Sequence, residues 1–278
     1  HPGGGGGGEE QRSLRLKQLK PLVLKRLIDR LGMEMAMIFC RTNVDCDVLE
    51  RFLTAQGGGR AFAGKVESGK ENPYSCCVLA GMRSQAERRA NLQAFREGDV
   101  RFLICTDVAA RGIDVQGLPY VVNMTLPDVA ENYIHRVGRV GRADCMGLAI
   151  SIVAAPELKE KVWFHTCPNR GRGTQCTRRH LKDDGGCTIW YDEPDLLAQV
   201  EVRLGAAVAP VGPDLRLPEG FGGGGGGGGV RYGEQAAAGG DGATPAHLAA
   251  LQPAVAQLAA LEVEAQNNWL AMKQRFRP

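Results

Sequence analysis

The sequence predicts an α/β protein: a parallel sheet with helices on both faces, followed by a partly disordered C-terminal extension. From about Leu16 onward, short apolar segments alternate with segments of helical period, which is the arrangement of β-α-β units. The 278 residues, 44% of them hydrophobic, suffice for one globular core. Much of the excess among the 38 glycines falls in runs at 3–8, 57–59 and 222–229, which are typical of linkers.

The expected helices follow from apolar spacing and from residues that favour helix ends. Leu19, Val23 and Leu27 recur on one face of the first helix. Asn43 favours the start of the second helix, and Gly98 favours the end of the third, which is charged and amphipathic. In chain order, helices are expected at 16–31, 43–56 and 84–96, and from Asp128 into an arginine-glycine loop at 136–142.

Apolar segments that are too short for helices are expected to be buried strands. They are residues 35–40, 75–79, 101–105, 120–124 and 147–153. Because helices separate successive strands, the sheet is expected to be parallel, and the order of elements is that of a RecA-like domain. Ligand groups should then lie on loops at the carboxyl ends of the strands.

The alternation stops after Ala155. A helix is expected near Glu157 to Phe164, and another from Pro194 to Leu204. The expected organisation is a glycine-rich disordered start at 1–13, the sheet domain at 14–155, an α/β extension packed on it at 156–209, a disordered glycine-rich linker at 210–250 and a C-terminal helix at 251–278. The last helix could pack on the core or on a partner protein.

Composition excludes some classes of protein. The net charge of +3 is too small to indicate nucleic-acid binding by itself, so any such indication must come from the placement of the arginines. Nine cysteines without a regular framework fit a reducing compartment better than a secreted disulfide scaffold. No apolar run approaches the roughly 20 residues that span a bilayer, so no membrane association is expected.

The segment from Thr106 to Asp114 follows an expected strand and combines groups that suit phosphate and ribose. Thr106 and nearby backbone N–H groups, with Gly112 allowing close approach, suit a phosphate of single-stranded nucleic acid. Asp114 is a short acceptor that suits a ribose hydroxyl. The alternative for Thr106 is a helix N-cap, which is the commoner role of a threonine after a strand.

Three arginines spaced by three residues lie in a second segment, from His135 to Arg142. Arg136, Arg139 and Arg142 would repel one another unless anions share them, and polyphosphate is the natural partner. Arginines of this kind, supplied across a domain cleft, stabilise the charge that develops in phosphoryl transfer. The alternative is a solvated basic loop.

Together with Met37 to Thr42 and Gln85 to Arg88 upstream, these two segments resemble motifs IV, IVa, V and VI of the DEAD-box RNA helicases, in order and with similar separations. This resemblance covers about residues 16–153. A narrower resemblance, to the DEAD-box helicase with a SPRY insertion in its first RecA-like domain, extends over nearly the whole chain. It implies that residues 14–155 are the second RecA-like domain of an ATP-dependent RNA helicase, the half that grips the RNA backbone and supplies arginine fingers for ATP hydrolysis and local duplex unwinding.

The resemblance also implies roles for single residues. The implied ATP-binding residues are Gly112, Asp114, Arg139 and Arg142, of which the last two would be the catalytic fingers. The implied RNA-binding residues are Arg41, Thr42, Gln85, Arg88, Thr106 and Arg111. The residues implied to couple the two ligands are His135, Arg136 and Arg111. Two departures from the family pattern, Val140 in place of threonine and a long loop at 57–73, remove no charged group that the mechanism needs.

The remaining catalytic parts are expected in a first RecA-like domain outside this chain. That domain would carry the phosphate loop and the Asp-Glu pair and would hold most of the contacts to Mg²⁺, so the isolated chain is expected not to hydrolyse ATP. Two segments imitate these parts. Residues 59–66 have phosphate-loop spacing but lack the Ser or Thr that binds magnesium, and Asp192 to Asp195 is better explained as the start of a helix.

The cysteine-rich stretch at 165–187 allows two interpretations. Cys176 and His180 have the spacing of zinc ligands, and the candidate zinc set is Cys167, Cys176, His180 and Cys187. The lack of a Cys-x₂-Cys pair favours the other interpretation, in which the thiols are idle and the neighbouring arginines contact RNA or solvent.

A non-catalytic RNA-binding scaffold of a ribonucleoprotein is the main alternative function, and a DNA-directed helicase is another. The finger arginines argue against the scaffold, which has no need of them. The expected partners are single-stranded or locally unwound RNA, the first RecA-like domain of the same protein and, from the resemblance, proteins of RNA-processing or tRNA-ligation complexes. The expected locations are the nucleus and the cytoplasm.

Overall fold

The computed structural model describes residues 6–59, 71–141, 146–165, 167 and 176–217. Some of the predictions above lie outside the described residues. They are the role of Arg142, most of the phosphate-loop-like segment at 59–66, the linker at 218–250 and the C-terminal helix at 251–278. The disorder expected at 210–217 is wrong, because Leu215 and Leu217 pack against the main core cluster.

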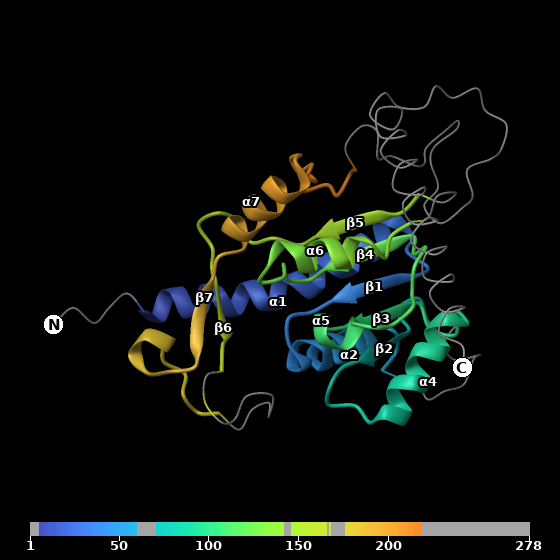
Figure 1. The fold of residues 1–278 in the computed structure, drawn as a ribbon, viewed down its shortest axis with the longest axis horizontal. Coiled ribbons are helices and arrows are strands. Elements are labelled where there is room, and N and C mark those ends of the chain that lie inside the picture. Colours follow the sequence, from blue (N-terminus) through green and yellow to red (C-terminus); the bar gives the residue numbers. More distant parts are fainter. Residues whose placement is uncertain (1–5, 60–70, 142–145, 166, 168–175, 218–278) are drawn as a thin grey trace, which may run out of the picture. The chain divides into compact units, whose positions relative to one another are not determined.

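A five-stranded sheet with the order β2-β3-β1-β4-β5 forms the centre of the fold (Figure 1). Its strands are β1 (Ala36–Phe39), β2 (Cys76–Leu79), β3 (Phe102–Cys105), β4 (Tyr120–Asn123) and β5 (Leu148–Ser151). All neighbouring strands are parallel, and each strand lies inside its predicted segment. The predicted α/β class with a RecA-like parallel sheet is therefore confirmed.

Helices cover both faces of this sheet. They are α1 (Gly6–Leu31), α2 (Asn43–Gln56), α4 (Gln85–Arg96), α5 (Asp107–Ala110) and α6 (Ala130–Val137). Because successive strand residues point to opposite faces, Ile38 packs in the core cluster with α1 and α2, whereas its neighbour Met37 packs in the cluster with α4 and α5. Strand residues buried on both sides explain the continuous apolar segments of the sequence.

Side-chain caps fix the first residues of α2 and α4. Thr42 Oγ1 accepts a hydrogen bond from the Asp45 N–H at 3.1 Å, and the Asp45 carboxylate accepts one from the Thr42 N–H at 3.1 Å. Thr42 is therefore the N-cap of α2 rather than Asn43, because its extended backbone lets the hydroxyl reach the third helical residue. Ser84 and Glu87 form the same reciprocal pair at α4, as the predicted start of that helix requires.

The first helix begins well before Leu16, so the disordered start expected at 1–13 is wrong for residues 6–13. Ser13 is buried, and its Oγ accepts a hydrogen bond from the Lys161 N–H at 2.8 Å. Composition could not reveal this contact, because the partner lies 148 positions away in the sequence.

The extension after the sheet contains an antiparallel strand pair and a helix. These elements are β6 (Glu160–Trp163), β7 (Thr188–Tyr191) and α7 (Glu193–Leu204). The helix expected near 157–164 is wrong, because Glu160 and Val162 alternate into the interior and the backbone pairs with β7. The predicted helix start after Tyr191 is confirmed, since the Asp192 carboxylate accepts a hydrogen bond from the Asp195 N–H at 3.2 Å.

A buried ionic cluster joins α1 to the extension and to the sheet domain. The Lys20 ammonium pairs with the carboxylates of Glu160 on β6 and Glu193 on α7, the latter at 2.8 Å. Glu193 is fully buried, and it also accepts hydrogen bonds from the N–H groups of Leu126, at 3.3 Å, and Ala154, at 2.9 Å. Buried ion pairs therefore hold the extension against the sheet domain.

Candidate functional site

The Arg136 side chain, from α6, ties together the carboxyl ends of three neighbouring strands. Its Nε and Nη2 donate to the Asp107 carboxylate at 2.6 and 2.8 Å, after β3. Its Nη1 donates to Asn123 Oδ1 at 2.9 Å and to the Thr125 carbonyl at 2.7 Å, at the end of β4. The guanidinium also lies 4.9 Å from the centroid of the Phe39 ring, at the end of β1. Arg136 is 1% exposed, so its contacts are with the protein itself.

Thr106 directly precedes Asp107, the ion-pair partner of Arg136, and it is the N-cap of α5. Its Oγ1 accepts a hydrogen bond from the Ala109 N–H at 3.4 Å, and the residue is 6% exposed. The cap that the sequence offered as the alternative is therefore what the structure shows. Only the small exposed part of the Thr106 surface could contact a phosphate.

Arg139 is held by the loop that follows α5. Its Nη1 donates to the Ile113 carbonyl at 2.6 Å and lies 3.4 Å from the Val115 carbonyl, while its Nη2 lies 3.5 Å from the Ala110 carbonyl. Asp114, on the same loop, has an exposed side chain. The structure thus brings together two of the residues predicted to bind ATP.

Gly112, also on this loop, has a φ of +74°, a conformation that favours glycine. It is exposed, and a Cβ atom built on it would meet no atom within 4 Å. The glycine is therefore required by the turn rather than by a close neighbour, and the loop leaves open space beside it.

The predicted RNA-binding residue Arg41 is largely covered by the extension. Its Nη1 donates to the Trp163 carbonyl at 2.7 Å, its Nε lies 3.6 Å from Asp128 Oδ1, and its guanidinium lies 5.1 Å from the centroid of the Tyr191 ring. The Arg41 side chain is 12% exposed. None of these three partners was predicted from the sequence. The helix start expected at Asp128 is wrong, because α6 begins at Ala130 and Asp128 contacts Arg41 and Tyr191 instead.

Tyr191 is fixed where it packs against Arg41. Its hydroxyl donates to the Leu126 carbonyl and interacts with the Asp128 carboxylate, each at 2.8 Å. Burial, followed by the neighbouring Asp128 charge, raises the pKa of the Tyr191 hydroxyl well above its ordinary value. The group therefore remains a protonated hydrogen-bond donor.

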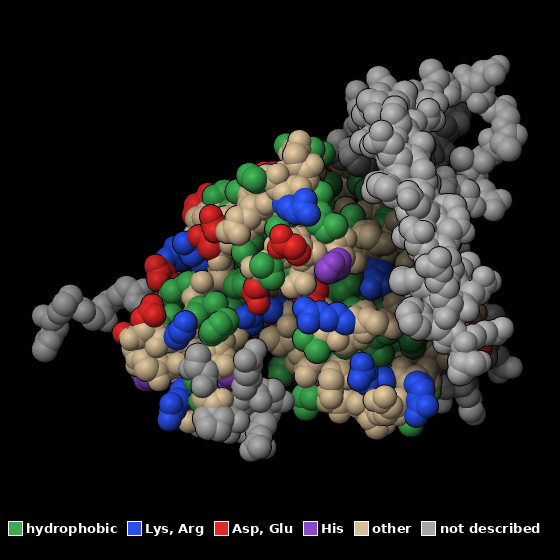
Figure 2. All heavy atoms as spheres, in the orientation of Figure 1, with side chains coloured by type: hydrophobic (Ala, Val, Ile, Leu, Met, Phe, Trp, Pro, Cys, Tyr) green, Lys and Arg blue, Asp and Glu red, His purple; other side chains and the backbone are tan. Residues whose placement is uncertain are grey.

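The other predicted RNA-binding residues lie nearer the surface. Gln85, Arg111 and His135 are exposed, and Arg88 is half-buried. The Nε of Arg88 has no hydrogen-bond partner among the described residues. On the face shown in Figure 2, Lys and Arg side chains lie over α4 and α5, whereas acidic side chains gather mainly over α6, α7 and the β6–β7 pair. Gln85 and Arg88 on α4 and Arg111 at the end of α5 thus belong to the basic part of this face, whereas His135 is on α6.

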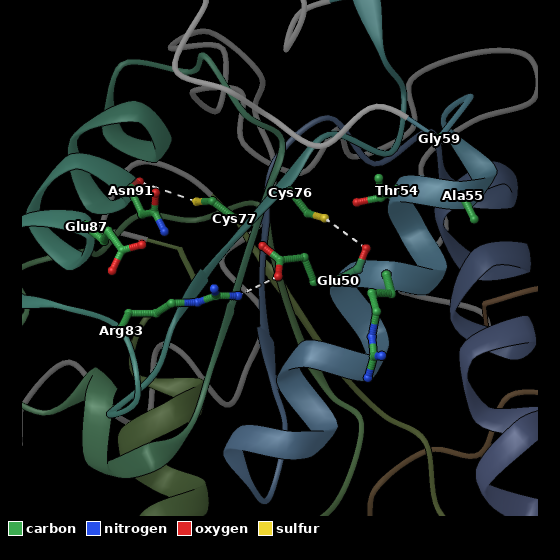
Figure 3. Close-up of a pocket in the computed structure, with 10 residues that line it drawn as sticks. Glu50, Thr54, Ala55, Gly59, Cys76, Cys77, Arg83, Glu87 and Asn91 are labelled. Atoms are coloured by element: carbon green, nitrogen blue, oxygen red, sulfur yellow. Dashed lines mark hydrogen bonds and ion pairs between the residues drawn. The ribbon is translucent and has the colours of Figure 1, made fainter. Parts of the chain in front are cut away.

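A cavity of about 470 Å³ lies beside the edge strand β2, between α2 and α4 (Figure 3). Arg83 projects into it and pairs with Glu50 at 2.6 Å. Burial raises the pKa of the Cys76 thiol to about 12 and that of the Cys77 thiol further, so both remain protonated. None of the described residues that line the cavity is a predicted site residue. One lining residue, Gly59, is the last described residue before the gap at 60–70.

The structure brings together three of the four residues predicted as zinc ligands. Cys167, Cys176 and Cys187 lie close to one another, but the histidine beside them is His165 rather than His180. His180 is exposed, and its carbonyl accepts hydrogen bonds from Thr188 at the start of β7, so its side chain has been turned to solvent.

None of the described helices combines the length and the apolar character needed to cross a membrane.

Residues 19–144 match the family model described as the helicase conserved C-terminal domain. Over 97% of its length, the chain is 48% identical to the ATP-dependent RNA helicase DDX1 of Xenopus laevis and 43% identical to Ddx1 of Drosophila melanogaster. It spans 34% of each protein, about a third of the length of these curated relatives. The solved C-terminal domain of the DEAD-box protein Dbp5 is 32% identical over 49% of this chain and 70% of that one, with a TM-score of 0.41.

Proposed function

Because this chain belongs to the DEAD-box helicase family and carries its C-terminal helicase domain, we propose that it is the half of an ATP-dependent RNA helicase that grips RNA and supplies arginine fingers. The proposal rests on the contrast between two arginines. The charge of Arg136 is neutralised by Asp107, whereas Arg139 is held only by neutral carbonyl groups. An arginine fixed in place without a carboxylate partner is suited to a polyphosphate.

Arg139 and Asp114 form the ATP-facing part of the proposed site. Within the described ranges, no carboxylate lies at ion-pair distance from Arg139, so its positive charge is available to an anion. Three carbonyl contacts limit its motion, which reduces the cost of ordering it when ATP binds. The exposed Asp114 carboxylate can accept a hydrogen bond from a ribose hydroxyl. These residues fit ATP, and Arg142 would be the second finger.

The RNA-facing part consists of exposed and half-buried residues on α4 and on the loop after α5. Gln85, Arg88 and Arg111 can contact phosphate and sugar groups without reading base edges, which gives sequence-tolerant binding. Arg41 and Thr106 are mostly buried, so in this proposal they shape the surface and offer few donors directly. Thr42 is the N-cap of α2, so in this proposal it fixes the start of that helix. His135 is exposed and directly precedes the buried Arg136.

Coupling between the two ligands would pass through the strand ends that Arg136 joins. The carboxyl ends of β3, β1 and β4 carry the loops of both ligand groups, and Arg136 contacts all three ends. A displacement of one loop is therefore resisted by the others. Closure of a first RecA-like domain onto this one would then bring RNA and ATP into the same cleft, so that binding of either favours the other. Mg²⁺ would be held mainly by that first domain.

The test is RNA-stimulated ATP hydrolysis by this chain alone and mixed with the first RecA-like half of a related DEAD-box helicase. We expect no turnover by the chain alone and turnover in the mixture, because the fingers act across the cleft. A folded chain that associates with the first half and binds RNA without any turnover would contradict the proposal and favour the RNA-binding scaffold. Action in the nucleus and cytoplasm, with RNA-processing or tRNA-ligation proteins, is part of the same proposal.

A further inference from the structure

Three cysteines and one histidine converge in the long connection between β6 and β7. His165 and Cys167 follow β6, and Cys176 and Cys187 precede β7. The imidazole nitrogen and the three Sγ atoms all lie within 4.8 Å of one another. Residues from both ends of the connection thus place four potential metal ligands around one point.

The spacing of these atoms matches a tetrahedral metal site. The Sγ atoms of Cys167 and Cys176 are 3.7 Å apart, and Cys167 Sγ lies 3.9 Å from His165 Nδ1. A tetrahedron with metal–sulfur bonds of about 2.3 Å has sulfur–sulfur edges of about 3.8 Å. A disulfide would require a separation of about 2.0 Å. The two thiols therefore stand at the distance of metal ligands rather than at the distance of a covalent bond.

The backbone and a neighbouring ring hold these ligands in place. Phe164 N–H donates to the Cys187 carbonyl at 2.8 Å, and Cys187 N–H donates to the Arg178 carbonyl at 3.0 Å. The His165 ring stacks on Trp163 with centroids 5.0 Å apart and an interplanar angle of 11°. Cys187 is fully buried. The cluster is thus partly preorganised, which favours metal affinity.

The cysteines of the sheet domain differ from this group. Cys40, Cys46, Cys76, Cys77 and Cys105 are buried among the aliphatic residues of the two core clusters. They fill space as small apolar side chains, and burial raises the pKa of Cys105 well above its ordinary value. Among the described residues, only the cluster after β6 combines thiols with an imidazole at ligand distances.

We propose that His165, Cys167, Cys176 and Cys187 bind one Zn²⁺ in a closed tetrahedral site. Three thiolates and one imidazole form a Cys₃His set, which prefers zinc and leaves no position open for a substrate. Binding at neutral pH converts the three thiols to thiolates and releases three protons to solvent. The site is therefore structural, and it fixes the connection between β6 and β7.

The metal has a clear structural task at this position. An isolated pair of short antiparallel strands is marginally stable at best in water. Both β6 and β7 have four residues, and a long connection joins them. The Trp163 carbonyl at the end of β6 holds Arg41 at 2.7 Å, so zinc bound two residues later would also steady that arginine. The zinc site does not depend on ATP hydrolysis and is tested separately from it.

The first test is the zinc content of the full chain, purified under reducing conditions without chelator. We expect one zinc per chain, released together with three thiols when a mercurial reagent is added, and Co²⁺ substitution should give the visible absorption of tetrahedral thiolate-bound cobalt. A folded chain that retains no zinc after supply of the metal overturns the proposal.

The two histidines provide a matched pair of variants. His165→Asn should lower zinc retention at least about tenfold, because it removes one ligand, whereas His180→Asn should retain zinc as the unchanged chain does. Equal retention by His165→Asn and the unchanged chain, or loss caused by His180→Asn alone, overturns the ligand set. Since the metal count on the unchanged chain needs no substitution, misfolding of a variant cannot hide a negative result.

Discussion

At the scale of single residues, Arg136 and Arg139 show how neighbouring arginines acquire different roles. Arg136 is buried and makes two hydrogen bonds to Asp107, so its charge is balanced inside the protein. Arg139 is half-buried and is held by carbonyl groups. The sequence presents both as members of one repeated pattern. Only their surroundings separate a side chain that stabilises the fold from one that can meet a ligand.

Replacement of Arg139 by alanine should remove ATP turnover in the two-domain mixture while RNA binding persists. Arginine fingers raise the rate of hydrolysis by about 10³ to 10⁵, so turnover should fall by a factor in this range. RNA affinity should change by less than about threefold. Arg142→Ala is expected to behave in the same way. The measurements are RNA-stimulated hydrolysis and RNA binding by anisotropy.

The control for this prediction is Arg216→Ala, which removes the same charge from a side chain that is 76% exposed and pairs with Asp214. It should leave both measurements unchanged. A collapse of RNA affinity in Arg139→Ala that parallels the loss of turnover would contradict the finger assignment.

Replacement of Arg136 by alanine should destabilise the domain by about 3 kcal/mol, because it leaves the Asp107 carboxylate and the strand-end acceptors without their buried partner. Urea denaturation of the full chain measures the free energy of unfolding. A loss below about 1 kcal/mol, the range of exposed ion pairs, would show that Arg136 does not hold the strand ends together.

At the scale of elements, the β6–β7 pair and α7 are held to the sheet domain by specific polar contacts. Lys20 on α1 pairs with both Glu160 and Glu193, and Arg41 donates to the Trp163 carbonyl. A small apolar cluster of α6 and α7, around Tyr133 and Val200, adds to these contacts. Elements that are marginal by themselves are thus stabilised by docking.

The buried Glu193 carboxyl should make stability depend on pH. Burial raises the pKa of Glu193 above its ordinary value, although the Lys20 charge opposes this and Glu160 shares Lys20. A raised folded-state pKa stabilises the fold at pH values below the unfolded pKa, and this contribution is lost as pH rises through the folded pKa.

The prediction is tested by the difference in free energy of unfolding between the unchanged chain and Glu193→Gln. This difference should decrease as pH rises from the ordinary glutamate value toward neutrality, because glutamine cannot take up the proton. Denaturant titrations at a series of pH values measure it. A difference that is constant, or that increases with pH, would contradict the assigned direction of the pKa shift.

At the scale of the whole molecule, one parallel sheet would arrange the two proposed ligand surfaces. The loop after α5 carries Arg111, which we propose for RNA, and Asp114, which we propose for ATP. The basic side chains over α4 and α5 extend the first surface (Figure 2). An RNA-binding surface of this kind recognises charge and backbone shape, so its affinity should depend strongly on salt.

Salt dependence distinguishes phosphate contacts from other effects of mutation. For single-stranded RNA, each phosphate neutralised contributes about 0.7 to the slope of log affinity against log salt. Arg88→Ala and Arg111→Ala in the two-domain mixture should each reduce the slope by about this amount and act equally on two unrelated RNA sequences. Arg216→Ala serves as the control. A slope that does not change, or a loss confined to one sequence, would contradict backbone contact.

Local sequence signals are enough to predict the sheet and the position of its ligand loops. Apolar segments such as 102–105 predict strands buried on both faces, and Gly98 after a charged amphipathic segment predicts a helix end, because both signals are local. The motif residues Asp114 and Arg139 were identified by the same kind of local pattern. In the structure, the Arg139 side chain, which follows α6, donates to the carbonyl groups of Ile113 and Val115, the two residues that flank Asp114.

Contacts between residues that are far apart in the chain become visible only in the folded protein. Lys20 and Glu193 are separated by 173 positions and Arg41 and the Trp163 carbonyl by 122, so no local pattern connects them. For the same reason the sequence could not show that Arg41 is covered, or that His165 rather than His180 completes the cysteine cluster. Local signals predict the strands of the sheet and its helices, whereas strand β6 and the burial and partners of a side chain depend on which distant elements pack together.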